Sequence, residues 1–243
     1  MTKTSKINIS IDPNSLRQLK NNKFILTVFR GIQSSDQGFV PLVMSIYDDY
    51  LSNNQIVIND NKLGGYISTE KIKPGVKITA TVPQQTRNGI ASSNSINIES
   101  GQKMIIDKVG NLSLKNSGGA NLKIVNNNQN TFTTGFGNIN DDNSKFQLFC
   151  AGNIFNGNLL KVIPSDAFLV VFTTDRSFQP GVYKKKLSDT GFLIHTLKGV
   201  ERNVSFSQTK GWSANNEVWA KRIHQGSSLA SILIKNMSGI GER

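Results

Sequence analysis

The sequence reads Ile7-Asn8-Ile9-Ser10-Ile11 near its N-terminus, with apolar and polar side chains in strict alternation. Successive side chains of a β-strand point to opposite faces of the sheet, so this pattern predicts a strand with one buried face. The same alternation recurs at residues 76–82, 96–98, 112–114, 122–124 and 204–206. We therefore expect an all-β protein, built as an antiparallel β-sandwich with very little helix.

Two further segments are apolar almost without interruption, at residues 24–29 and 168–172. Runs of this kind are typical of central strands that are covered on both faces. Turn-forming residues separate the expected strands at the short spacing of antiparallel sheets. Helix is expected in only two places: a short turn at 15–20, capped by Asn14 or Ser15, and a weak one at 218–223.

Two pairs of segments resemble each other and occur in the same order. Residues 24–28 resemble 168–172, and residues 56–66 resemble 204–212. Matches this short arise by chance about as readily as by duplication, so two organisations stay open. The chain forms either two related sandwich units in tandem, at 1–117 and 118–243, or one continuous β domain. The stretch Ser117-Gly118-Gly119 is the natural joint for the first alternative.

The chain is strongly basic, with 28 Lys and Arg against 16 Asp and Glu and a net charge of +12. Each half carries 14 basic and 8 acidic residues, so the charge supports solubility first and an anionic partner second. The N-terminus lacks the apolar run of about 7 to 15 residues that a secretory signal needs. We expect a protein that is cytoplasmic as synthesised, with release by lysis or a signal-independent route.

Residues suited to catalysis are few. The only histidines are His195, expected to be structural and partly buried in an apolar strand, and His224, expected at the surface. Cys150 is the only cysteine, so no intramolecular disulfide can form, and its β-like surroundings predict a buried, inert thiol. We therefore predict no catalytic residue and no enzymatic activity.

Metal and cofactor sites are equally hard to build from this composition. One cysteine and two separated histidines cannot form a closed zinc site. The pair Asp48-Asp49 offers oxygen ligands for calcium, but its surroundings lack the spacing of an EF-hand, and polar turn residues are the simpler interpretation. The chain also lacks a glycine-rich phosphate-binding fingerprint. We predict neither a metal nor a cofactor.

One constellation combines basic and aromatic residues in the C-terminal third of the chain. Its members are Tyr183, Lys184, Lys185, Lys186, Arg202, Lys210, Trp212, Trp219, Lys221 and Arg222. Cations beside rings suit an anionic lipid headgroup, a charged glycan or single-stranded nucleic acid. Under the alternative interpretation, the tryptophans are core residues and the lysines keep a sheet edge soluble. The sequence contains no recognition helix, zinc finger or aromatic RNA-binding strand, which argues against nucleic acid.

These observations favour a non-enzymatic β-sandwich that acts as a structural protein. It would bind a partner or self-assemble into a homo-oligomer through its sheet edges and faces. The alternative is a soluble toxin of the pore-forming type that attaches to anionic membranes through the basic aromatic residues. An enzyme that uses Cys150 or an aspartate pair is the weakest of the three hypotheses.

Overall fold

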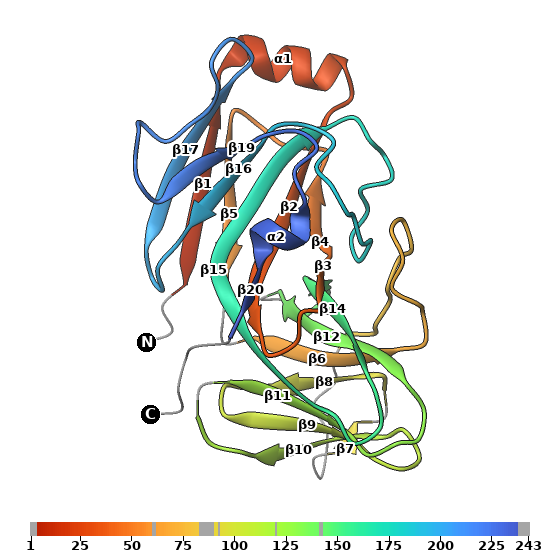
Figure 1. The fold of residues 1–243 in the computed structure, drawn as a ribbon. Helices are drawn as coiled ribbons and strands as arrows, with labels where there is room; N and C mark the ends of the chain where they lie inside the picture. The colour runs from red at the N-terminus through yellow and green to blue at the C-terminus, as the bar shows by residue number, and fades with distance from the viewer. Residues whose placement is uncertain are drawn as a thin grey trace.

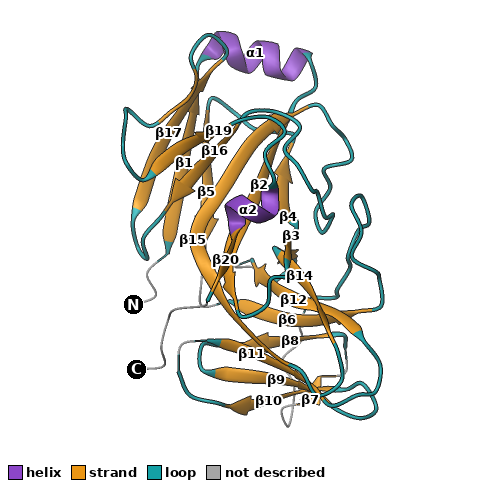
Figure 2. Ribbon diagram, viewed as in Figure 1, coloured by secondary structure: helices purple, strands orange, loops and turns teal. Residues whose placement is uncertain are grey.

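The computed structural model describes residues 4–59, 62–82, 90–91, 93–119, 121–140 and 143–237. Strands account for 52% of the structure and helices for 6%, which confirms the predicted all-β, sandwich-like fold (Figure 2). Within these residues, the strands form three mostly antiparallel sheets of four, ten and six strands. Each sheet is named below by the number of its strands.

The four-stranded sheet joins the two ends of the chain. Its order is β18 (Gly211–Ser213), β17 (Glu201–Ser207), β1 (Ser5–Ile11) and β5 (Asn53–Ile58). β1 is parallel to β17 and antiparallel to β5. The alternation in β1 has the predicted effect: Ile7, Ile9 and Ile11 are buried, while Asn8 and Ser10 lie on the outer face.

The ten-stranded sheet forms the spine of the molecule (Figure 1). Its main path is β19 (Ala220–Ile223), β16 (Gly191–His195), β15 (Leu159–Thr173), β11 (Leu122–Asn126), β9 (Gln102–Ile106), β10 (Leu112–Asn116) and β7 (Ile90–Ala91). β2 (Ile25–Ser34) pairs with β15 and also with β4 (Val43–Tyr47) and β20 (Ile234–Asn236).

The six-stranded sheet lies below β2 and β4 in the view of Figure 1, next to β9 and β11. Its order is β3 (Val40–Pro41), β14 (Cys150–Ile154), β12 (Phe132–Ile139), β6 (Leu63–Ser68) and β8 (Ser95–Ile98). β13 (Phe146–Leu148) pairs with β12 alongside this path.

Strand β15 is covered on both faces, as its continuous apolar run predicts. Phe168, Val170 and Phe172 point into the main core, which lies between the four-stranded and ten-stranded sheets and continues toward the six-stranded sheet. Leu169 and Val171 point into a second core on the opposite face of β15. That second core is closed by the short helix α2 (Leu229–Leu233), in front of β2 and β15 in Figure 1, and by the segment 174–190.

The first helix follows its local capping chemistry. Helix α1 (Pro13–Asn21) confirms the helical turn predicted at 15–20. Its cap is Asp12, whose carboxylate accepts hydrogen bonds from the backbone N–H groups of Asn14 and Ser15, so the prediction that Asn14 or Ser15 caps the helix was wrong. Within the described chain, neither helix has the length and hydropathy needed to cross a bilayer.

Two sequence predictions about secondary structure are wrong. The weak helix predicted at 218–223 is wrong, because residues 220–223 form β19 and pair with β16. The strand predicted at 76–82 is also wrong, although Ile78 is buried as the alternation implies. This segment makes only an isolated bridge between Lys77 and Val182 and no continuous ladder.

Hydrogen bonding crosses the proposed boundary between residues 117 and 118. β1 pairs with β17, and β2 pairs with β15, so strands from both halves belong to the same sheets. The resembling segments 24–28 and 168–172 lie in the adjacent strands β2 and β15. Division of the chain into two units, 1–117 and 118–243, remains a prediction.

Arg30 connects the ten-stranded sheet to the six-stranded sheet. The residue is 1% exposed on β2, and its guanidinium carbon lies 5.2 Å from the Phe149 ring and 5.3 Å from the Phe168 ring. Its Nη1 donates to Asn138 Oδ1 on β12 at 2.9 Å, and its Nε donates to the Ser165 carbonyl at 3.2 Å. A guanidinium is planar and carries several N–H donors, so arginine can stack between two rings and donate hydrogen bonds at the same time.

We expect Arg30→Lys to destabilise the protein by roughly 3 kcal/mol, because an ammonium cannot keep both hydrogen bonds and both ring contacts. Urea unfolding followed by circular dichroism measures this change. Arg17→Lys, on the exposed side of α1, is the control and should leave the midpoint unchanged. Equal midpoints for the two variants would show that Arg30 does not hold the sheets together.

Candidate functional site

The residues considered for catalysis lie apart from any common centre. Cys150 is fully buried in β14, as predicted, and burial raises the pKa of its thiol to about 12. His224 is exposed, in agreement with the sequence prediction. His195 is also exposed, at the last position of β16, so the expectation of a partly buried histidine was wrong.

Oxygen-rich residues do not converge on a metal site in the part of the chain that the structure describes. There, no group of three or more His, Cys, Asp or Glu side chains lies close enough to share an ion. Asp48 and Asp49 are exposed in the loop between β4 and β5, where polar turn residues were expected.

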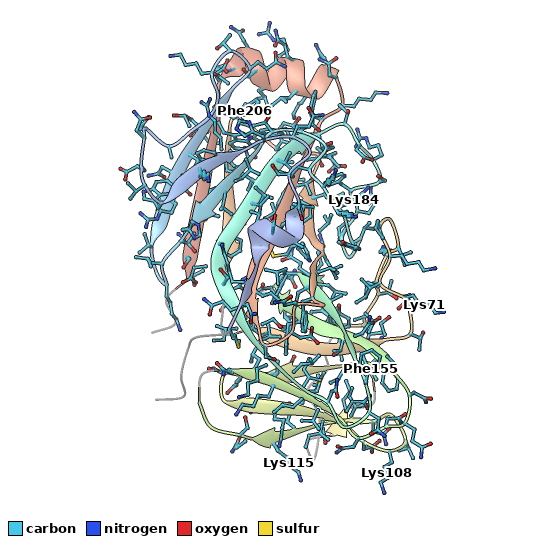
Figure 3. All side chains as sticks on the ribbon, viewed as in Figure 1. Lys71, Lys108, Lys115, Phe155, Lys184 and Phe206 are labelled. Atoms are coloured by element: carbon cyan, nitrogen blue, oxygen red, sulfur yellow. The ribbon has the colours of Figure 1, made fainter. Side chains whose placement is uncertain are left out.

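The predicted basic aromatic region is divided between the two faces of the ten-stranded sheet. Trp212 lies in the main core, whereas Lys184 lies 4.6 Å from the ring of Phe178, a residue of the second core. Figure 3 labels Phe206, a neighbour of Trp212, just below α1, and Lys184 well away from it on the right. The ten residues therefore do not form one continuous surface.

The lysine run sits in the segment that covers the second core. Lys184 forms an ion pair with Asp175 at 3.4 Å. Tyr183 makes a backbone bridge to Leu42, while Lys185 and Lys186 are exposed. These contacts explain the local conformation without any ligand.

Lys221 and Arg222 lie on opposite faces of β19, although they are adjacent in sequence. Lys221 pairs with Leu193, which belongs to the second core, and Arg222 pairs with Phe192, which belongs to the main core. Directly paired residues share a face of the sheet, so the two cations point in opposite directions. Of these two cations, only Arg222 lies on the main-core face, where Trp212 is found.

On the main-core face, Trp212 and Arg222 fasten the edges of the two sheets together. Trp212 is 1% exposed and stacks on Phe172 and Phe192, with ring centroids 5.1 and 5.9 Å apart. Arg222 donates from Nε to the Trp212 carbonyl at 2.7 Å and from Nη2 to the Lys210 carbonyl at 2.6 Å. These contacts match the alternative in which Trp212 is a core residue.

Trp219 and Arg202 remain more accessible. The guanidinium of Arg202 lies 4.6 Å from the Trp219 ring, which is only partly buried. Val218 is 100% exposed in the loop before β19, and Leu197 is 59% exposed in the loop after β16. The backbone N–H of His195 donates to the Trp219 carbonyl at 2.8 Å, so the two loops lie at the same end of the sheet. We call Leu197, Val218 and Trp219 the apolar end.

The outer face of the four-stranded sheet carries a ladder of amides that the sequence analysis missed. Asn8 Nδ2 donates to Asn203 Oδ1 at 2.8 Å, and Gln55 Nε2 donates to Asn8 Oδ1 at 2.9 Å. The row therefore runs without a break from β17 through β1 to β5. The sequence does contain a sign of this ladder, because the polar positions of these strands are mostly uncharged. Only the strand register shows that the amides align.

An open cleft of about 1100 Å³ lies between α1 and the β17–β18 turn. Exposed side chains line it from both elements, including Arg17, Gln18, Gln208 and Lys210. Asp12 also lines the cleft, but its carboxylate is engaged in capping α1. The cleft is open, and none of its lining residues has a buried polar side-chain atom that lacks a hydrogen-bond partner.

The free edge of β5 is a second feature that the motifs did not reveal. β5 is the last strand of its sheet and pairs only with β1 among the described strands. The Ile11 N–H donates to the Ser52 carbonyl at 2.7 Å, which sets the phase of the antiparallel ladder. With that phase, the backbone N–H and C=O groups of Asn53, Gln55 and Val57 point away from β1.

Comparison of the chain with protein-family models, with curated proteins and with solved structures gives no match.

We expect the Cys150 thiol to resist 5,5′-dithiobis(2-nitrobenzoic acid) at pH 8 in the native protein. A pKa of about 12 leaves roughly one thiolate in ten thousand at this pH, and burial blocks the reagent. Absorbance at 412 nm measures the reaction, and labelling should become complete only in denaturing urea. Rapid labelling of the folded protein would revive the nucleophile hypothesis.

Proposed function

We propose that this protein is a non-enzymatic structural protein that self-assembles, with the free edge of β5 as its contact. The observation that carries the proposal is the composition of this edge. β5 reads Asn53-Asn54-Gln55-Ile56-Val57-Ile58, so it contains neither a charged residue nor a proline. Edge strands commonly carry such residues to prevent pairing with another chain. By contrast, β19, an edge strand of the ten-stranded sheet, carries Lys221 and Arg222.

A two-fold pairing of β5 with its copy satisfies the outward backbone groups. Gln55 would face Gln55 of the second copy, and Asn53 would face Val57. In this register the amide ladder of Asn203, Asn8 and Gln55 continues directly into the second copy. Val57, which is 49% exposed, would lose part of its contact with water.

Local charge is compatible with such a contact despite the net charge of +12. Lys6, which lies beside Val57 on β1, is paired with Glu201 at 3.2 Å. The edge strand itself is neutral, so the repulsion between two basic chains acts mainly outside the contact and is screened by salt. We also propose that the chain is cytoplasmic as synthesised.

A second candidate function, attachment to an anionic membrane or glycan, is favoured by the apolar end. Val218 and Leu197 expose their side chains to water beside Trp219. A cation lies directly beside this end, because the Arg202 guanidinium is 4.6 Å from the Trp219 ring. Apolar groups flanked by cations suit the boundary between lipid headgroups and acyl chains.

We expect the wild-type protein to show a mass above that of one chain in size-exclusion chromatography with light scattering. Gln55→Lys should weaken association roughly tenfold or more, because it sets two lysines directly opposite each other. Asn53→Pro should act in the same direction by removing an outward N–H. Ser205→Lys adds the same charge to the outer face of β17, away from the edge, and serves as the control. A wild-type mass of one chain at every concentration would refute the proposal.

For the membrane alternative, we expect salt-sensitive pelleting with phosphatidylserine vesicles and none with phosphatidylcholine vesicles. Val218→Asp should reduce binding several-fold, since it replaces an exposed apolar contact by a negative charge. Val109→Asp, at a position 79% exposed in the β9–β10 turn, is the matched control. Equal losses in both variants would assign the effect to net charge, and no pelleting of the wild type would dismiss this function.

A further inference from the structure

A small pocket opens between the two sheets of the sandwich, on the side where β4 and β5 end them. Its volume is about 350 Å³, near the lower end of the range for small-molecule sites. Leu26 of β2 and Ile56 of β5 contribute apolar surface from the two sheets. The β4–β5 loop and the segment 145–147 supply polar residues around it.

Ser45 marks this pocket as more than a gap in packing. It lies on β4 opposite Val28, a residue of the main core, so its side chain points between the sheets, where the pocket lies. Ser45 is 5% exposed, and its Oγ has no hydrogen-bond partner in the described chain. A buried hydroxyl without a partner costs free energy, and a bound ligand would remove that cost.

The polar rim offers both hydrogen-bond acceptors and hydrogen-bond donors. Asp48 and Asp49, consecutive in the β4–β5 loop, contribute carboxylates that only accept hydrogen bonds. Lys145 precedes β13 and only donates, whereas Gln147 lies within β13 and has an amide that both donates and accepts. Tyr47 adds an aromatic ring with a hydroxyl group. A ligand here meets acceptor-only carboxylates from the β4–β5 loop, and donors together with one amide acceptor from residues 145–147.

From this arrangement we infer that the pocket binds one ring of a neutral saccharide. Sugar hydroxyls donate and accept at once, which matches a rim with both kinds of group, and the C–H face of a sugar matches Tyr47 and the apolar residues. The volume suits a single small ring. Asp48 and Asp49 disfavour an anion, while Lys145 disfavours a simple cation.

Amide chemical shifts of isotopically labelled protein, followed during titration, test the inference. The probes are the methyl glycosides of glucose, galactose, mannose and N-acetylglucosamine, with inorganic phosphate and putrescine as anionic and cationic comparisons. We expect at least one glycoside to shift the amides of Ser45, Tyr47 and Gln55 with a millimolar Kd, and the two charged probes to leave them unchanged. Shifts with a charged probe alone, or with no probe, overturn the inference.

Ser45→Ala separates binding from structure. Loss of a hydroxyl that has no partner should leave the urea midpoint unchanged or raise it, whereas glycoside affinity should fall several-fold. The double variant Asp48→Asn with Asp49→Asn should weaken binding roughly tenfold or more. The control is Glu99→Gln with Glu217→Gln, which removes two carboxylates from exposed positions elsewhere. Equal affinity in all variants would show that the glycoside binds at another place.

The pocket and the proposed assembly can fail separately. Gln55 lines the pocket and also belongs to the β5 edge, so a second copy on that edge lies close to the pocket mouth. The titration is therefore repeated with Asn53→Pro, a residue that does not line the pocket. Binding by this variant supports the pocket whatever the oligomeric state, and its failure to bind any glycoside refutes the pocket alone.

Discussion

The antiparallel pairing of β2 with β15 is the interaction on which the rest of the structure depends. Both strands contribute to the main core on one face and to the second core on the other, so neither core can close before they meet. The register shifts between Pro164 and Phe168, where a proline can be accommodated at an irregularity. N-terminal to this shift, β15 pairs with β11. The same strand thereby connects the sandwich at the top of Figure 1 to the strands at the bottom.

Much of the fold could be predicted from side-chain periodicity, because burial of one or both faces dictates which residues a strand carries. The alternation at 7–11 and the apolar run at 168–172 identified β1 and the C-terminal part of β15 correctly. The segment 76–82 shows the limit of this reasoning. Its Ile78 is buried, yet a face to bury does not supply a neighbouring strand, and only one bridge forms. Pairing partners depend on contacts between residues far apart in sequence.

The candidate sites were harder to predict for the same reason. Proximity in sequence suggested that Lys184, Trp212 and Arg222 could act together, but the ten-stranded sheet separates Lys184 from the other two. The amide ladder and the pocket at Ser45 combine residues from several strands, and no local motif announces either. Asp48-Asp49 was noticed as an oxygen-rich pair, whereas its apolar and donor neighbours become visible only in the folded chain.

The parallel pairing of β1 with β17 has a consequence for biosynthesis. A ribosome releases residues 5–11 long before residues 201–207, so β1 must wait for most of the chain before this neighbour exists. Until then β5 is its sole available partner in the sheet, and the three isoleucines of β1 remain incompletely covered. Contacts between segments so far apart in sequence form late, which slows folding and prolongs the exposure of hydrophobic surface. This nascent chain should therefore depend on chaperones more than a protein whose contacts are mostly local.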